Sequence, residues 1–164
     1  MREILFRGKS TGNREWIKDG EWVEGLPMYT ANKSEKGKID RILTLRDGYY
    51  SILLVDTETV CQYTGLTDKN GRKIFEGDIV KLILPDGEIR YFKVTIKSVV
   101  RKVLCHPDFD DEVSKVEITG IVFEWNGYEL FPCIDTYGVP DYKMMEVIGN
   151  VFDNPELVER GKSK

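Results

Sequence analysis

The sequence predicts an all-β protein built from hairpins, with one short helix near its C-terminal end. Five Asx-Gly pairs recur along the chain, and such pairs favour two-residue hairpin turns because both residues accept positive φ. Runs rich in β-branched and aromatic residues lie between the pairs. No window of 12 or more residues carries a helical stripe. The pairs are Asp19-Gly20, Asp47-Gly48, Asn70-Gly71, Asp86-Gly87 and Asn126-Gly127.

The β-branched and aromatic runs supply the expected strands. From Arg90 to Lys97, the residues Phe92, Val94 and Ile96 would face one side and the intervening residues the other. Such alternation is typical of a half-buried strand. The expected strands are Arg41–Leu45, Tyr49–Val55, Ile79–Leu84, Glu88–Ser98, Val116–Trp125, Tyr128–Cys133 and Val147–Phe152.

The one clear helix signal follows these strands. Asn154 can act as the N-cap, and Pro155 suits the first helical position. Glu156 places a negative charge at the positive end of the helix dipole. Gly161 and a Lys-Ser-Lys tail follow at once, so the helix must be short.

Length, charge and hydropathy set the broad class of the protein. At 164 residues the chain fits one domain, residues 1–164, or an N-terminal lobe 1–58 packed on a barrel 59–158. A net charge of −4 argues against strong sequence-independent DNA binding. The N-terminus lacks the apolar core of a signal peptide, and no apolar run approaches the ~20 residues that cross a bilayer. We therefore expect a cytoplasmic protein.

The segment Val60–Leu82 is the most informative part of the chain. It passes through a turn at Asp68–Gly71 and then reaches Glu76-Gly77-Asp78, where Gly77 can take a conformation closed to other residues. A Gly-Asp-Ile-Val step then leads into a core strand, an Asp-Gly hairpin and a second strand. This order is a common way to build a small, compact SH3-like barrel.

Three sequence blocks resemble the conserved segments of a known family. The first is Phe6–Lys9 with Trp22–Gly25, similar to the opening FRGK and WVxG of the family. The second joins Thr59-Val60, Gln62–Leu66, Asp68–Gly71 and Glu76–Val80, similar to TV, QYTGL, DKNG and EGDIV. The third joins Glu146–Asn150 and Asn154–Leu157, similar to EVIGN and NPEL. The blocks follow one another in order over nearly the full length, and together they resemble the YopX family of bacteriophage and prophage proteins.

The resemblance implies an SH3-like, all-β, phage-derived protein acting in the bacterial host cell. It implies no known activity. Two departures stand out: Cys61 lies where the family commonly has glycine, and Arg90–Lys115 matches no block. Within the blocks, nine residues are expected to have structural roles. They are Gly65, Asp68, Asn70, Gly71, Glu76, Gly77, Asp78, Gly149 and Asn150.

No catalytic or metal constellation is expected, and no cofactor. The segment Cys105–Glu112 holds thiol, imidazole and carboxylate groups, but its spacing fits neither a zinc motif nor an EF-hand. We interpret it as an exposed acidic loop. His106 is the only histidine, and a nucleophile pair would need Cys61 or Cys133 from across the fold. All three cysteines are expected to be small buried hydrophobic residues: Cys61, Cys105 and Cys133.

A nucleic-acid face is the second possibility. Six residues interleave basic and aromatic groups along the predicted strands: Arg90, Tyr91, Lys93, Lys97, Arg101 and Lys102. SH3-like and OB barrels can stack bases on such faces. The net negative charge opposes this interpretation. The three tryptophans, Trp16, Trp22 and Trp125, are expected to be core residues rather than ligand contacts.

The leading hypothesis is a non-enzymatic phage accessory protein that acts as a protein-interaction or assembly module. Self-association into a homo-oligomer is expected, because a β architecture has edges that need covering. A nucleic-acid-binding barrel is the first alternative, and a cysteine-centred enzyme is the second.

Overall fold

The computed structural model describes residues 3–12, 14–29, 37–104 and 113–160. Contacts divide the chain into two compact units. One unit comprises Met1–Thr67 and Gly71–Gly77, and the other Asp68–Asn70 and Asp78–Lys164. The chain therefore passes from one unit to the other within the informative Val60–Leu82 segment. The division at residue 58 that the sequence suggested stays a prediction.

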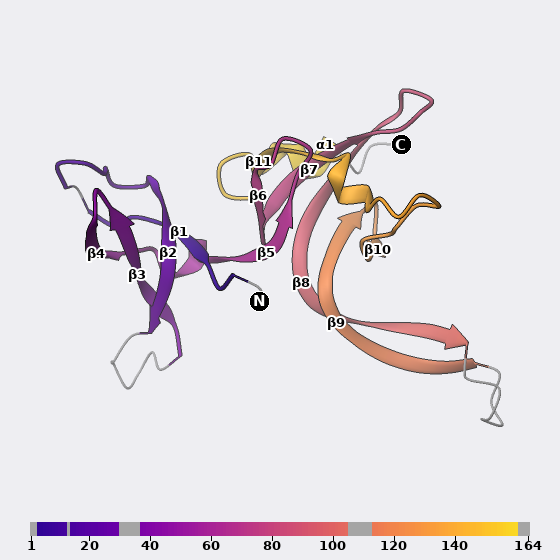
Figure 1. Ribbon diagram of the computed structural model, residues 1–164, viewed down its shortest axis with the longest axis horizontal. Helices are drawn as coiled ribbons and strands as arrows, with labels where there is room; N and C mark the ends of the chain where they lie inside the picture. The colour runs from indigo at the N-terminus through magenta and orange to yellow at the C-terminus, as the bar shows by residue number, and fades with distance from the viewer. Residues whose placement is uncertain (1–2, 13, 30–36, 105–112, 161–164) are drawn as a thin grey trace. The chain divides into compact units, whose positions relative to one another are not determined.

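The first unit is a six-stranded antiparallel sheet (Figure 1). Its strand order is β4-β3-β2-β1-β5-β6, with a 3₁₀ turn at Thr57–Thr59 between β4 and β5. Ile17, Val23, Ile42, Leu53 and Val55 form its core cluster. The strands are β1 (Phe6–Lys9), β2 (Trp22–Tyr29), β3 (Ile39–Arg46), β4 (Tyr49–Leu54), β5 (Cys61–Thr67) and β6 (Lys73–Phe75).

The second unit is a five-stranded antiparallel sheet in the order β10-β9-β8-β7-β11. A 3₁₀ turn at Asp141–Lys143 precedes β11, and the short helix α1 (Glu156–Arg160) packs against β8. Val80, Val94, Val122 and Phe123 are among its buried core residues. The strands are β7 (Asp78–Ile83), β8 (Ile89–Leu104), β9 (Val113–Trp125), β10 (Tyr128–Leu130) and β11 (Glu146–Asn150).

The all-β class and the short C-terminal helix are confirmed, and two of the five Asx-Gly pairs form the expected two-residue hairpin turns. At Asp19-Gly20, Asn70-Gly71 and Asp86-Gly87 only the glycine has positive φ. Asp47-Gly48 and Asn126-Gly127 each form a two-residue turn with positive φ at both residues. These turns join β3 to β4 and β9 to β10. Among the described strands no pairing closes either sheet into a barrel, so the SH3-like closure stays a prediction.

Several strand boundaries differ from the expected ones. The expected strand Glu88–Ser98 begins one residue later and continues to Leu104, and Val116–Trp125 begins at Val113. The expected Tyr128–Cys133 ends at Leu130, just before a segment containing Pro132, which has no N–H for a ladder. The expected Val147–Phe152 begins one residue earlier and ends at Asn150. There the Asn150 side chain accepts from the Phe152 and Asp153 amides and so caps a turn.

Residues of the YopX-like blocks hold turns and strand ends together. The Asp68 side chain is 2% exposed, and its two oxygens accept hydrogen bonds from the Asn70 amide (2.8 Å) and the Val147 amide (3.0 Å). Lys69 adds an ion pair with Glu146 at 2.8 Å. These contacts connect the Asp68–Asn70 segment to the β11 strand, and the structural role expected for this motif stays a prediction.

Arg7 of the first block is a buried cation. It is 6% exposed, and its guanidinium lies 4.6 Å from the centroid of Trp22 and 4.7 Å from that of Phe75. Cation–π attraction is strongest where the cation is shielded from water, so this contact contributes to the stability of the first unit.

The close approach of β2 to β3 requires glycine at position 25. A Cβ added to Gly25 would clash with the Leu43 carbonyl and would lie 2.7 Å from Ile42 Cγ2. We expect Gly25→Ala to lower the free energy of unfolding by about 2 kcal/mol, because the backbone must shift. Gly120→Ala is the control, since its Cβ would meet only Phe131 at 3.5 Å. Equal urea midpoints for the two variants would contradict the tight packing of Gly25.

Candidate functional site

A groove of about 750 Å³ lies within the second unit. It is bounded by β8, by the hairpin of β9 and β10, and by α1. Apolar and aromatic side chains supply part of its lining, and one lysine, two glutamates and the Asn126-Gly127 turn supply the rest. The apolar set includes Phe92, Trp125, Tyr128, Leu157 and Val158, and the charged set is Lys93, Glu124 and Glu129.

The Asn126-Gly127 turn creates the aromatic part of the groove. Because the turn has two residues, it places Tyr128 directly opposite Trp125 on the same face of the hairpin. Their rings stack with centroids 6.0 Å apart and planes 24° apart. Phe92 follows next, with its ring centroid 6.4 Å from that of Trp125. Tyr128 is 62% exposed, so much of its ring remains available to a ligand.

Arg90 packs against the Trp125 ring of this aromatic cluster. Its guanidinium lies 4.5 Å from the Trp125 centroid. The same guanidinium forms an ion pair with Glu88 at 3.0 Å, which raises the pKa of Arg90. The arginine is thus held by an aromatic ring and a carboxylate together.

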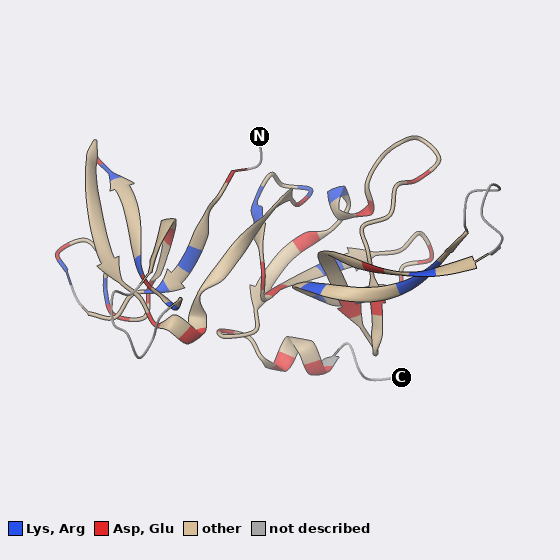
Figure 2. Cartoon of the chain, turned by 90° about the horizontal axis from the view of Figure 1, so that it is seen from below, with Lys and Arg blue, Asp and Glu red and all other residues tan. Residues whose placement is uncertain are grey.

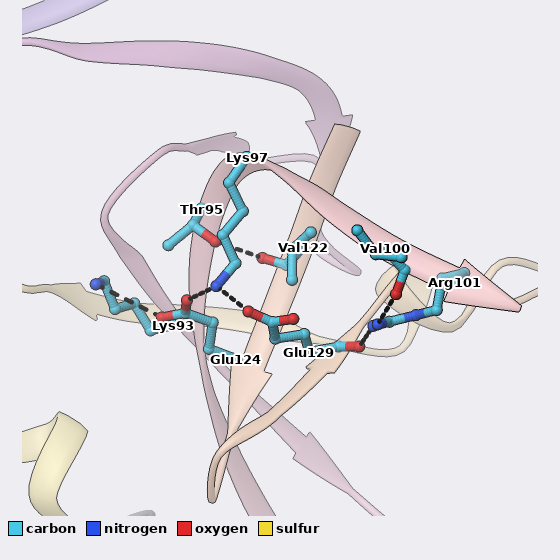
Figure 3. A network of polar contacts seen from close by, with 8 residues as sticks. All are labelled: Lys93, Thr95, Lys97, Val100, Arg101, Val122, Glu124 and Glu129. Atoms are coloured by element: carbon cyan, nitrogen blue, oxygen red, sulfur yellow. Dashed lines mark hydrogen bonds and ion pairs between the residues drawn. The ribbon is translucent and has the colours of Figure 1, made fainter. Parts of the chain in front are cut away.

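Lys93, Glu124 and Glu129 of the groove lining form a compact ion network with Lys97 (Figure 3). Glu124 and Glu129 face each other on β9 and β10, an arrangement that would be repulsive alone. The Lys97 Nζ lies 2.5 Å from a carboxylate oxygen of each. Lys93 adds a second contact to Glu124 at 3.6 Å. The two lysines balance the two glutamates, so the network has no net formal charge.

The network shifts the pKa values of its members in opposite directions. Burial alone would raise the pKa of Glu124, but the contacts from Lys97 and Lys93 outweigh it and the pKa is lowered. Hydrogen bonds to Glu124 and Glu129 raise the pKa of Lys97. Both shifts favour the charged forms, so the ion pairs persist across neutral pH.

The lowered pKa of Glu124 makes its contribution to stability depend on pH. This contribution is complete above the pKa of the unfolded carboxyl and is lost as the pH falls through the lower folded pKa. The contribution of Lys97 to stability has the opposite pH dependence. It is present at lower pH and is lost as the pH rises through the raised pKa of Lys97. Carbon NMR should show the Glu124 carboxyl titrating at lower pH in the native protein than in Lys97→Met. Identical titration midpoints would contradict the network.

The six residues expected to form a nucleic-acid face all lie on β8, but alternation divides them. Tyr91, Lys93, Lys97 and Arg101 point to one side of the strand, and Arg90 and Lys102 to the other. Arg101 donates to the backbone carbonyls of Val100 and Glu129 and lies 5.4 Å from the Phe131 centroid. Basic and acidic residues both occur on the strands of this unit (Figure 2). The structure therefore does not gather the six into one continuous basic surface.

Other sequence expectations have mixed outcomes. Cys61 is buried as expected, but Cys133 is exposed, because it lies in the connection that follows β10. Cys105, His106 and the rest of 105–112 lie outside the described residues. Among the residues that the structure does describe, no three His, Cys, Asp or Glu side chains are grouped as a metal ion would require.

The three tryptophans have different surroundings. Trp16 packs against the core cluster of the first unit and Trp22 against Arg7, so both have packing roles. Trp125 packs against Phe92 and Arg90 and also lines the groove, so the expected packing role for it stays a prediction. Tyr128 and Glu129 were not predicted as site residues. The Asn126-Gly127 hairpin was the signal that could have placed them beside Trp125 and Glu124.

Comparison with known proteins identifies the family. The profile described as YopX protein matches residues 5–159. The chain belongs to the YopX family. A solved structure, protein EF1440 from Enterococcus faecalis, is 22% identical, with 96% of this chain and 99% of that chain covered and a TM-score of 0.49. A comparison with curated protein sequences gives no match. In the described part of the chain, no helix has the length and apolar character needed to span a membrane.

In this YopX-family protein the groove lies mostly outside the three sequence blocks. Ile79 belongs to the EGDIV block and Leu157 to the NPEL block, and both line the groove. The aromatic and ionic side chains come from Tyr91–Lys93 and Glu124–Glu129, outside every block. The blocks thus build the scaffold, and the strands between them supply the candidate site.

Proposed function

We propose that this YopX-family protein is a non-enzymatic interaction module of phage or prophage origin, acting in the bacterial cytoplasm. Its groove on β8, β9 and β10 binds an apolar or aromatic segment of a partner protein. The observation that carries the proposal is a neutral groove with stacked, partly exposed aromatic rings. The phage origin and the cytoplasmic location rest on the family resemblance.

The chemistry of the groove suits a polypeptide. A large apolar side chain of the partner can pack between Trp125, Tyr128 and the Leu157 side of α1. Aromatic side chains with a polar end are enriched where protein partners bind, because they bury much area and still meet water. The Lys97–Glu124–Glu129 network can accept and donate hydrogen bonds at the edge without a charged partner.

The nucleic-acid alternative has less support from the same side chains. Trp125 and Tyr128 could stack a base, but the neighbouring lysines are bridged to glutamates. A phosphate at this position would have to compete with Glu124 and Glu129 for the same cations. Strong binding of nucleic acid depends on cations that exchange small counterions for phosphates. We therefore expect no binding of single-stranded DNA or RNA tighter than about 10⁻⁴ M even at ~50 mM salt.

A peptide-display selection tests the proposal. A library of random linear peptides is selected against the immobilised wild-type protein, and one enriched peptide is synthesised and titrated. We expect enrichment of aromatic and large apolar residues and at least roughly tenfold weaker binding to Tyr128→Ala, as for an interface anchor. The control is Tyr137→Ala, since Tyr137 is 90% exposed and does not line the groove.

Two outcomes would contradict this function. One is the absence of any enriched peptide class that competes for a common site. The other is equal loss of binding in Tyr128→Ala and Tyr137→Ala, which would place the contact elsewhere. Thermal unfolding of both variants shows that any loss is not a loss of fold.

A further inference from the structure

Strands β8 and β9 continue beyond the rest of their sheet as a two-stranded arm (Figure 1). They pair with each other from Lys93 opposite Glu124 to Leu104 opposite Val113. Strand β7 pairs with β8 only as far as Lys93, and β10 pairs with β9 only as far back as Phe123. The arm therefore comprises residues 94–104 of β8 and 113–122 of β9.

No described strand pairs with the outer edge of β9 in this arm. On that edge, alternate backbone N–H and C=O groups point away from β8. Apolar side chains also remain exposed there, with Val113 at 48% and Ile118 at 38%. An edge of this kind can pair with another strand, and natural proteins rarely leave it open without protection.

The charges on the arm indicate which strand could pair with it. Lys102 lies directly opposite Lys115 in the register, and such a like-charge pair is destabilising. Near the groove, the comparable pair Glu124 and Glu129 is neutralised by Lys97. No ion pair joins Lys102, Lys115 or Glu117 to another described residue. Lys115 therefore forms no ion pair on the arm within the described part of the chain.

We propose that the outer edge of β9 pairs antiparallel with the β9 edge of a second copy of this chain, about a two-fold axis at Val116. Lys115 and Glu117 are two residues apart, so they lie on the same face of the strand. In this register Lys115 of each copy is opposite Glu117 of the other, twice per dimer. Ser114 meets Ile118, and Val116 meets its own counterpart, as a two-fold interface requires.

The outer edge of β8, on the other side of the arm, lacks this charge complementarity. On β8 the charged residues of the arm are Lys97, Arg101 and Lys102, with no acidic residue among them. Two β8 edges would therefore bring cations together. The arm of β9 carries one basic and one acidic residue, Lys115 and Glu117, and this pair makes its edge complementary to itself.

The dimer surface is separate from the groove, so it goes beyond the proposed function. The groove uses the Trp125–Glu129 end of the β9–β10 hairpin, whereas the pairing surface uses Val113–Thr119. A joined β8-β9-β9-β8 ribbon would leave one groove on each copy. One partner segment could then bind to each subunit.

Sedimentation analysis of the full chain tests the pairing. At about 150 mM salt, a series from about 1 to 200 µM should show a reversible monomer–dimer equilibrium for the wild type. Lys115→Glu and Glu117→Lys each place like charges opposite one another and should weaken dimerisation at least roughly tenfold. The double variant Lys115→Glu/Glu117→Lys restores opposite charges and should recover the wild-type equilibrium. Lys18→Glu and Glu15→Lys are exposed controls with the same charge changes.

The charge-reversal variants distinguish weaker dimerisation from a defect in folding of the monomer. Lys115→Glu removes the repulsion from Lys102, so its monomer should be no less stable than the wild type while its dimer is weaker. A wild type that stays monomeric at about 200 µM would overturn the proposal. So would single variants that dimerise like the wild type, or a double variant that remains as weak as the singles.

Discussion

Replacing Asp68 with alanine is expected to lower the free energy of unfolding by roughly 3 kcal/mol, because it leaves two backbone amides without their acceptor. One of these amides, that of Val147, makes its bond in a buried environment. A buried donor that loses its partner forfeits the bond and cannot recover it from water. The same substitution weakens the attachment of the Asp68–Asn70 segment to β11, leaving the Lys69–Glu146 ion pair, so the second unit should be most affected.

Asp86→Ala provides the matched control for this prediction. The Asp86 carboxylate also accepts from the amide two residues later, at 2.9 Å from Glu88, but in an exposed turn. Water can replace that bond, so its loss should cost less than about 1 kcal/mol. Urea denaturation followed by far-ultraviolet circular dichroism compares the two. Similar losses in both variants would show that the buried Val147 bond is not important.

Replacing Arg7 with alanine is the second large effect, again roughly 3 kcal/mol. The guanidinium lies between the rings of Trp22 and Phe75, at 4.6 and 4.7 Å from their centroids, and the residue is 6% exposed. Truncation removes both cation–π contacts and leaves a cavity between the rings. Arg7→Lys should be intermediate, because it keeps the charge but loses the planar stacking.

Arg46→Ala is the matched control for Arg7. Its guanidinium lies 4.8 Å from the Trp16 centroid, but its side chain is 50% exposed. An exposed cation–π contact contributes only about 0.5–1 kcal/mol. Thermal unfolding that shows an equal loss for the two alanine variants would contradict the special contribution of burial at Arg7.

The sequence predicted the turns of this fold better than its strand lengths. Asx-Gly pairs specify a local backbone geometry, so Asp47-Gly48 and Asn126-Gly127 form the hairpins that were expected. Strands β1, β2, β5 and β6 were not among the expected strands. Glycine weakens local strand preference, and β1 contains Gly8 while β2 contains Gly25. The position of Gly25 against Leu43 is a tertiary packing feature that no local pattern could reveal.

The candidate site was predicted only in part, and for a physical reason. The sequence marked β8 as rich in cations, and Lys93 and Lys97 do lie at or beside the groove. It could not reveal that Glu124 and Glu129 neutralise them, because these glutamates come from strands about thirty residues later. Charge on one strand therefore suggested a phosphate-binding face, whereas pairing across three strands produces a neutral groove.

The central claim, that the groove binds polypeptide rather than nucleic acid, is tested most directly by NMR of the three tryptophan indole N–H groups. Trp125 lines the groove, whereas Trp16 and Trp22 lie in the first unit, and Trp125→Phe assigns the signal. A display-selected peptide and a single-stranded DNA oligonucleotide are titrated separately at ~50 mM salt. We expect that the peptide shifts the Trp125 signal, leaves the other two unchanged, and binds far more tightly than the DNA. A Trp125 signal that responds to the DNA, or to neither probe, would contradict it.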